Sequence, residues 1–487
     1  MQQENTETTY TIKVLNKFFI TREEIVMMKK TLAVVMLLLL GTLLYVPFAQ
    51  AETTIDYGAA FRLRQENWDN VVNLNTNPTG GGADRNFFRL RTQVWGKVDF
   101  NQSLGVYARL VNEAKFFDGP FTAYKTNVNT DRFDPDELAV DNLYVDSKDI
   151  FGLPVDLRIG RQDFLGPDMY GEGFLIMDGT PGDGSRTFYF NAARAKVKFN
   201  KNNSVDFVYI DDPSTDTYLP TVHPAVAGGL YVDNKKILAA SREQALVIYG
   251  RSKVTENLLI EPYYIYKTEQ QFGATPKLKL NTVGARVVAT ANNLKFGGEF
   301  AHQFGEYDNG IDRTGNGGYV FVGREYQDIK LKPEFDLRYI YLSGDNPGTT
   351  NKNEAWDPLF SRNPYWNELT IYTQLNETAA LGGAGMPGYW TNTEIIKASM
   401  NLNFTPETKL NLAYQYLWAP QQSGITTGAL YSNDGKSRGS LPSAMLNHKF
   451  SKNLDGYILL EVFVPGSYYK AAAETASFFR WQLNFKI

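Results

Sequence analysis

Apolar and polar side chains alternate in short segments over most of the chain. In one stretch, FFRWQLNFKI, every second residue is bulky and apolar: Phe479, Trp481, Leu483, Phe485 and Ile487. A period of two predicts a β-strand with one apolar and one polar face. A half-buried strand of a soluble sandwich is the alternative, but an edge strand this apolar would promote aggregation.

The same alternation recurs in segments of about ten residues, the length of a strand that crosses a membrane. We identify 18 of them, with these approximate bounds: 55–68, 85–100, 103–115, 136–147, 154–163, 186–199, 204–211, 242–251, 257–267, 278–290, 293–304, 317–326, 332–342, 392–404, 408–418, 442–450, 456–464 and 476–487. The pattern predicts an all-β protein with one transmembrane antiparallel β-barrel of about 18 strands.

The connections between these segments support a membrane barrel. Those after even-numbered segments are short, as at residues 101–102 and 291–292, and those after odd-numbered segments are usually long, as at 116–135 and 212–241. Barrels of the outer membrane have short periplasmic turns and long extracellular loops. Residues 366–375, inside the long connection 343–391, could form a further strand, but an odd count would break this alternation. We therefore assign this stretch to the outside, as a short helix or an inward-folded constriction.

Several predicted strands carry an apolar row that we assign to lipid. One row is Leu410, Leu412, Tyr414, Tyr416 and Trp418, and others are Phe335, Leu337, Tyr339 and Tyr341, and Ile458, Leu460, Val462 and Val464. Tyr and Trp near strand ends are typical of interfacial aromatic girdles. The segment 476–487 is expected to pair with the first strand and close the barrel. It also resembles the signal read by the outer-membrane assembly machinery.

The first 51 residues read as a targeting region. Residues 27–51 combine Lys29 and Lys30, an apolar run and the small-residue signal Ala49-Gln50-Ala51, which predicts a cleaved signal peptide. A transmembrane anchor is the alternative, but the apolar run is short for a span. Residues 1–26 are interpreted as a mis-called N-terminal extension, and residues 52–487 as the barrel. We expect an exported protein of the bacterial outer membrane.

Composition restricts the chemistry. The chain has no cysteine, which excludes disulfides and thiolate metal sites. Its formal net charge of −4 provides no positive electrostatic field that would attract nucleic acid. Only three histidines exist, His223, His302 and His448, and they are scattered, which argues against a barrel hydrolase and a transition-metal site. No cofactor is expected, although acidic runs at 211–212 and 131–136 are candidate Ca²⁺ ligands in extracellular loops, with simple solvation as the alternative.

The predicted inner face of the barrel is basic. Alternation places these cations inward: Arg62, Arg64, Arg89, Arg91, Arg109, Arg158, Arg194, Lys196, Arg286, Arg338 and Arg480. Carboxylates are fewer on this face, and beside the first four arginines Glu66 alone offers too little compensation. One interpretation is that charge pairs simply line a polar lumen. The other is an anion path, because guanidinium groups bind carboxylates bidentately and stay charged.

One region resembles a known family. Gly160-Arg161-Gln162 at a strand end, Gly171-Glu172-Gly173 and the strand FYFNAARAKVKF, with DELAVDNLYVD before them, resemble the alginate export porin family of bacterial outer membranes. The resemblance implies an 18-stranded barrel whose arginine-rich constriction passes a polyuronate. It makes Arg158, Arg161 and Arg194 constriction candidates, together with the arginines at 62, 64, 89 and 91.

The sequence therefore favours an outer-membrane porin or export channel for anionic solutes or an anionic polysaccharide such as alginate. Its expected partners are outer-membrane lipids, such anions and the assembly machinery, and not nucleic acid. Two alternatives remain: a barrel that sheathes a partner protein such as a multihaem cytochrome, and a general diffusion porin.

Overall fold

The computed structural model describes residues 53–72, 74–75, 84–118, 132–173, 175–178, 189–224, 230–239, 241–361, 366–370, 391–423, 430–432 and 434–487. The expected N-terminal extension and signal peptide lie outside these residues. The part of the chain from Thr53 to Ile487 is one compact unit. Within the described ranges, no helix has the length and apolarity needed to cross a membrane.

The described residues form 22 strands in one sheet, and all but four of them build its wall. The 18 wall strands are β1 (Thr54–Asp69), β2 (Arg85–Asp99), β3 (Leu104–Asp118), β5 (Leu138–Ser147), β6 (Val155–Gln162), β7 (Phe190–Asn200), β8 (Asn203–Asp212), β11 (Glu243–Thr255), β12 (Leu258–Glu269), β13 (Leu278–Ala291), β14 (Leu294–Tyr307), β15 (Asp312–Glu325), β16 (Glu334–Leu342), β18 (Thr393–Asn403), β19 (Thr408–Trp418), β20 (Ser437–Lys449), β21 (Leu454–Pro465) and β22 (Ala476–Lys486).

Four shorter strands lie in the connections. They are β4 (Arg132–Asp134), β9 (Thr221–Pro224), β10 (Leu230–Asp233) and β17 (Lys352–Asn353). Two single-turn 3-10 helices, η1 (Ile150–Gly152) and η2 (Gly166–Asp168), precede and follow β6.

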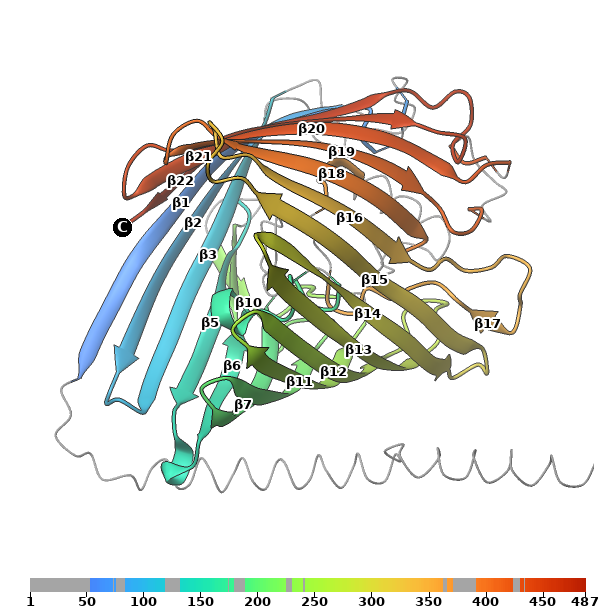
Figure 1. Ribbon diagram of the computed structural model, residues 1–487. Coiled ribbons are helices and arrows are strands. Elements are labelled where there is room, and N and C mark those ends of the chain that lie inside the picture. The colour runs from blue at the N-terminus through green and yellow to red at the C-terminus, as the bar shows by residue number, and fades with distance from the viewer. Residues whose placement is uncertain are drawn as a thin grey trace, which may run out of the picture. The chain divides into compact units, whose positions relative to one another are not determined.

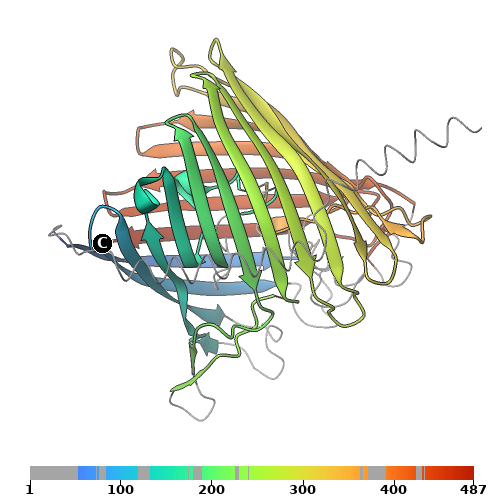
Figure 2. The same ribbon diagram turned by 90° about the horizontal axis from the view of Figure 1, so that it is seen from below.

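The wall is a closed barrel. Each wall strand pairs antiparallel with the next one. The last strand, β22, pairs with β1, so that Phe485 lies opposite Phe61 and Arg480 opposite Glu66. Figure 1 shows the blue first strands beside the red last strands, and Figure 2 shows the sheet returning on itself. Closure satisfies the backbone groups of both edges, which a sheet in lipid requires.

The two rims of the barrel differ in their connections. At the short-turn rim, β2 to β3, β7 to β8 and β13 to β14 are joined by residues 100–103, 201–202 and 292–293. At the long-loop rim the connections are mostly long, including 163–189 and 343–392. The predicted alternation is confirmed, and by analogy with other outer-membrane barrels the short-turn rim faces the periplasm.

The strand prediction is confirmed for all 18 wall strands, with the largest differences at two starts. Strand β15 begins at Asp312 rather than near 317, and β20 begins at Ser437 rather than near 442. Apart from Leu441, the added residues are polar or glycine, and they carry no alternation. They become strand because the neighbouring strand extends equally far, as in the pair Gly305 and Arg313.

The outer face is apolar where the alternation predicts it. Phe335, Leu337 and Tyr339 on β16 are 47%, 52% and 39% exposed, although they are large and hydrophobic. On β22, Phe479 and Phe485 are also exposed. A continuous band of exposed apolar side chains around a closed sheet is stable in lipid and not in water.

Candidate functional site

Five arginines stand on the inner face of three neighbouring strands, and we call them the arginine wall. They are Arg62 and Arg64 on β1, Arg89 and Arg91 on β2, and Arg480 on β22. Strand pairing places Arg62 opposite Arg91 and Arg64 opposite Arg89. Because the residues alternate with exposed outer ones, the period of the strand collects all five on one surface.

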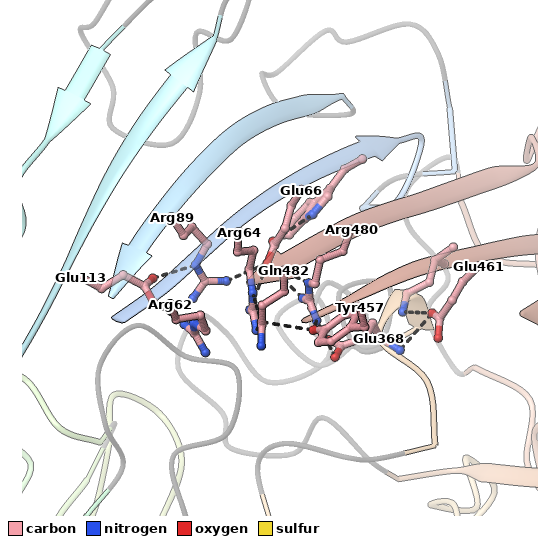
Figure 3. Close-up of polar contacts among 12 residues, drawn as sticks. Arg62, Arg64, Glu66, Arg89, Glu113, Glu368, Tyr457, Glu461, Arg480 and Gln482 are labelled. Carbon is pink, nitrogen blue, oxygen red and sulfur yellow. Dashed lines mark hydrogen bonds and ion pairs between the residues drawn. The ribbon is translucent and has the colours of Figure 1, made fainter. Parts of the chain in front are cut away.

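A buried glutamate joins three strands of the arginine wall (Figure 3). Glu66 has no exposed surface, and its Oε1 accepts hydrogen bonds from Arg64 and Arg89 at 3.1 Å. The same oxygen lies 3.0 Å from Nη2 of Arg480. One carboxylate thus links β1 to β2 on one side and to β22 on the other, across the closure of the barrel.

Two further glutamates complete the network. Glu113 of β3 binds Arg62 and also accepts a hydrogen bond from Nε of Arg89 at 2.6 Å. Glu368, from the connection between β16 and β18, accepts a hydrogen bond from Arg480 at 2.7 Å. Glu66, which by itself offers too little compensation, is therefore supplemented by two more carboxylates, one from β3 and one from an inward segment.

The arginine wall still carries a surplus of positive charge. Its five arginines face three glutamates, which leaves a net charge of +2. Among the described residues, Arg91 has no hydrogen-bonding or ion-pair partner, and Glu113 and Asp141 act on it only at longer range. Nε of Arg62 is also buried without a hydrogen-bond partner. Among the described residues of the arginine wall, these two guanidinium groups have a donor left unpaired, and that of Arg91 is the more accessible to an anion.

The connection after β6 folds into the barrel, and we call its described residues, 163–173 and 175–178, the inner loop. Phe164, Tyr170 and Met177 of this loop are at most 1% exposed. Tyr170 stacks on Tyr249 of β11 with ring centroids 4.3 Å apart. The phenol of Tyr249 accepts a hydrogen bond from the backbone N–H of Gly171 at 2.8 Å. The family-like segment around the two glycines is thus one part of the chain that narrows the interior.

Arginines of the surrounding wall hold two of the four acidic residues of the inner loop, Asp168 and Glu172, and we call this arrangement the loop clamp. Asp168 lies 2.8 Å from Arg194 and 3.4 Å from Arg158. Burial alone raises the pKa of Asp168, but these two guanidinium groups outweigh it and hold the pKa below its ordinary value. Lys196 is more distant, at 3.9 Å.

The second acidic residue of the loop clamp is Glu172. Its carboxylate binds Nη1 of Arg338 and lies 3.7 Å from Arg286, so it connects the loop to β16 and β13. Arg286 also binds Glu261 of β12. Arg251 of β11 completes the clamp by donating hydrogen bonds to backbone carbonyls of the loop.

A second segment from the connection 343–392 also folds inward, which was one of the two alternatives for it. Trp356, Phe360 and Leu369 are at most 3% exposed, and Phe360 forms a β-bridge with Met177 of the inner loop. Glu461 of β21 accepts the backbone N–H groups of residues 368 and 369 at 2.9 and 2.8 Å. Of the ambiguous stretch 366–375, residues 366–370 form no strand, and the remainder lies outside the described residues.

Two predicted site residues remain. Arg109 of β3 stands on the inner face and binds Asp141 at 2.8 Å and Asp163 at 2.7 Å. Arg161 does not join the inner set, because it is three residues from Arg158 and therefore on the other face of β6. It lies opposite the exposed Leu143, binds Asp216 at 2.8 Å and packs over Tyr189. The alternation of β6 alone would have placed Arg161 on the face opposite to Arg158.

Other residues of the interior were not predicted. Arg251 shares the inner face of β11 with Tyr249, so alternation within the predicted strand identifies it. Arg313 and Arg438 lie in the early parts of β15 and β20, where the sequence has no apolar period. Glu172 and Glu368 lie in connections, and no strand pattern places a loop residue inside a barrel.

The histidines and acidic runs form no common site. His302 contacts Asn316 and His448 contacts Thr408, on different strands. In the described part of the chain, no three His, Cys, Asp or Glu side chains come together as a metal-binding group. Of the candidate Ca²⁺ ligands, Asp211 is bound by Arg242.

Solved structures share the architecture. OccAB1 of Acinetobacter baumannii aligns with a TM-score of 0.54 and 11% identity, covering 89% of this chain and 96% of that one. OccK7 (OpdD) of Pseudomonas aeruginosa aligns at 0.52 and 12%, covering 88% and 99%. The outer membrane protein OprD of Pseudomonas aeruginosa aligns at 0.50 and 13%, covering 90% and 96%. At such identities the likeness concerns the fold.

The sequence comparison identifies the family. No curated protein sequence matches the chain significantly. The model of the family described as Alginate export matches residues 232–482, just over half of the 487 residues. The match does not include the segment 136–199 on which the sequence resemblance rests, so the two are separate indications. The chain therefore belongs to the Alginate export family and is an outer-membrane β-barrel.

Proposed function

We propose that this barrel is a passive channel for carboxylate-bearing solutes, with an anionic polysaccharide such as a polyuronate as its leading cargo. The observation that carries the proposal is the +2 surplus of the arginine wall together with Arg91, which has no ion-pair or hydrogen-bonding partner among the described residues. A surplus charge on a low-dielectric wall raises the local concentration of anions. A carboxylate can bind two guanidinium donors side by side.

The pairing of the other arginines supports passage rather than tight capture. Arg64, Arg89 and Arg480 already share Glu66, which leaves them few free donors. A path with one or two available guanidinium groups binds each carboxylate weakly, and weak, repeated binding is what conduction requires. No observation favours the partner-sheath or general-diffusion alternatives over this one.

The test is ion selectivity in planar bilayers. We expect the wild type to prefer Cl⁻ over K⁺, and the Arg62→Gln/Arg91→Gln variant to lose most of that preference, because it removes the two guanidinium groups with spare donors. The matched control is Arg324→Gln, an exposed arginine at the end of β15.

Two results would contradict the proposal. Cation selectivity in the wild type would exclude an anion path. No measurable conductance, even after connection 343–391 is shortened, would favour the sheath for a partner protein.

A further inference from the structure

Two arginines on neighbouring strands direct the same nitrogen atom toward one carboxylate of the inner loop. Arg158 of β6 and Arg194 of β7 lie directly opposite each other in the sheet. Nη1 of Arg194 lies 2.8 Å from Oδ1 of Asp168, and Nη1 of Arg158 lies 3.4 Å from Oδ2 of the same carboxylate. Because like charges on directly opposite residues repel each other, this position on the inner face favours an anion between the two guanidinium groups.

Carboxylates of the wall fix the orientation of both guanidinium groups. Arg158 donates from Nε and Nη2 to Asp146 of β5, at 2.6 and 3.0 Å. Arg194 donates from Nε and Nη2 to Asp206 of β8, at 3.0 and 2.7 Å. A guanidinium group has five N–H donors in a rigid fork and can therefore bind a second carboxylate through Nη1. We call the two Nη1 groups, which the wall holds in place, the Nη1 pair.

The carboxylate at the Nη1 pair comes from an accessible part of the inner loop. Leu165, the first residue of this part, is 41% exposed, and the Asp168 side chain is 23% exposed. By contrast, Glu66 of the arginine wall has no exposed surface. Phe164 and Tyr170, on either side of the accessible part, are at most 1% exposed and hold its two ends in the interior. Solutes therefore reach Asp168 without displacing these apolar anchors.

An anion from solution can make the contacts that Asp168 makes. Replacing one carboxylate by another at the Nη1 pair exchanges equivalent charge-assisted hydrogen bonds, so the main advantage of Asp168 is its attachment to the chain. A short flexible connection gives the attached group an effective concentration on the order of millimolar. A solute that carries several carboxylates gains from the same effect and can compete with Asp168.

We propose that Arg158 and Arg194 form a carboxylate-binding site whose built-in occupant is Asp168, and that an anion which takes its place frees residues 165–169 from the wall. Glu172 holds a corresponding position between Arg286 and Arg338. The inner loop is then a tethered competitor of the anions that pass it, and anion binding widens the passage. This inference rests on the proposed function and adds that the occupant of the site controls the position of the loop.

The test follows the inner loop directly by electron paramagnetic resonance. A nitroxide on Leu165→Cys labels the barrel at a single position, because the chain has no other cysteine. Hexaglutamate is the probe and hexaglutamine its uncharged counterpart, each added on both sides of lipid vesicles at about 0.1 M salt, where charges are screened beyond about 10 Å. We expect hexaglutamate to convert an immobile spectral component into a mobile one, with half of the effect on the order of millimolar probe. Hexaglutamine should leave the label immobile.

Two variants in the labelled protein serve as controls. In Asp168→Asn, the label should be mobile without any probe and should not respond to hexaglutamate, because the tethered carboxylate is gone. Asp146→Asn is the matched control, since it removes the wall carboxylate from the same Arg158 and leaves the loop carboxylate in place. Its label should stay immobile until hexaglutamate is added.

Two results would overturn the proposal. A label that hexaglutamate leaves immobile would show that Asp168 is a fixed structural ligand, and an equal response to hexaglutamine would show that the displacement does not depend on carboxylates. Ion selectivity, measured on the same preparations, separates this proposal from the channel proposal. A preference for Cl⁻ over K⁺ with a label that stays immobile would refute only the exchange at Asp168. Cation selectivity with a label that hexaglutamate mobilises would contradict only the channel proposal.

Discussion

On β1, β2 and β22, arginines meet glutamates, and two of the three glutamates are fixed on strands of the same wall. On β6, β7, β13 and β16, arginines meet acidic residues carried by a loop, and three of these arginines also pair with carboxylates of neighbouring strands. In the arginine wall, Glu66 and Glu113 cannot move without the sheet. In the loop clamp, Asp168 and Glu172 belong to a connection and depend on their arginines for their position.

The two regions therefore use arginine in two different ways. In the arginine wall, buried ion pairs tie strands together and leave a positive surplus. In the loop clamp, arginines determine where the inner loop lies and hence how narrow the interior is. A count of inward arginines does not distinguish the two tasks, because it ignores where each carboxylate comes from.

The largest effect is expected from Glu66→Gln. This change leaves Arg64, Arg89 and Arg480 buried without the carboxylate they share. Breaking a buried ion pair by removing one partner costs about 3–5 kcal/mol. Unfolding by urea in lipid vesicles, followed by tryptophan fluorescence, should show a loss of this size.

A matched control for that change is Glu334→Gln on β16. Glu334 is 44% exposed and lies 3.5 Å from Lys409, so its pair is solvent-screened and should contribute less than about 1 kcal/mol. Equal losses for the two variants would mean that the arginine wall is not the stabilising network described above.

An intermediate effect is expected from Glu172→Gln. The change removes a charged acceptor from Arg286 and Arg338 and should cost about 1–3 kcal/mol, with the loss concentrated in the inner loop. The main readout is single-channel current, which should rise or open more often because the loop is released from the wall.

The comparison variant is Asp336→Asn, which removes a different partner of Arg338 at 3.6 Å. Asp336 lies on β16 and anchors no loop in the described part of the chain, so the open-channel current should stay at the wild-type level. If both variants change the current alike, the charge near Arg338 matters and the attachment of the loop does not.

The alternation of apolar and polar residues was sufficient to predict the 18 strands of the barrel wall. The closing strand illustrates the reason, because the period that makes Phe479 and Phe485 apolar and exposed makes Arg480 inward. A strand of period two, closed by pairing, leaves only two directions for a side chain. The same rule corrects Arg161, which the family resemblance placed inside and which parity places outside.

The interior could be predicted only in part. Glu172 and Glu368 reach the arginines from connections whose path depends on tertiary contacts, such as the stacking of Tyr170 on Tyr249. The alternation of apolar and polar residues along the chain does not reveal such contacts. Strand parity assigned the ambiguous stretch of connection 343–391 to the outside, with an inward fold as one of two alternatives, and Glu461 was not identified as an anchor for that segment.

The smallest effect on stability, and the sharpest test of the arginine wall, is expected from Arg91→Gln. Among the described residues Arg91 has no ion-pair or hydrogen-bonding partner, so its removal should change the free energy of unfolding by less than about 0.5 kcal/mol. Arg89→Gln is the matched comparison, two residues away on the same face, and should cost about 3–5 kcal/mol because it removes a shared partner from Glu66 and Glu113.

The effect of Arg91→Gln on ion selectivity should be large although its effect on stability is small. Arg91→Gln halves the surplus from +2 to +1 and should lower the Cl⁻/K⁺ permeability ratio without changing the urea midpoint. An Arg91→Gln protein that is as unstable as Arg89→Gln, or that retains the full anion preference, would show that Arg91 is a structural arginine like its neighbours.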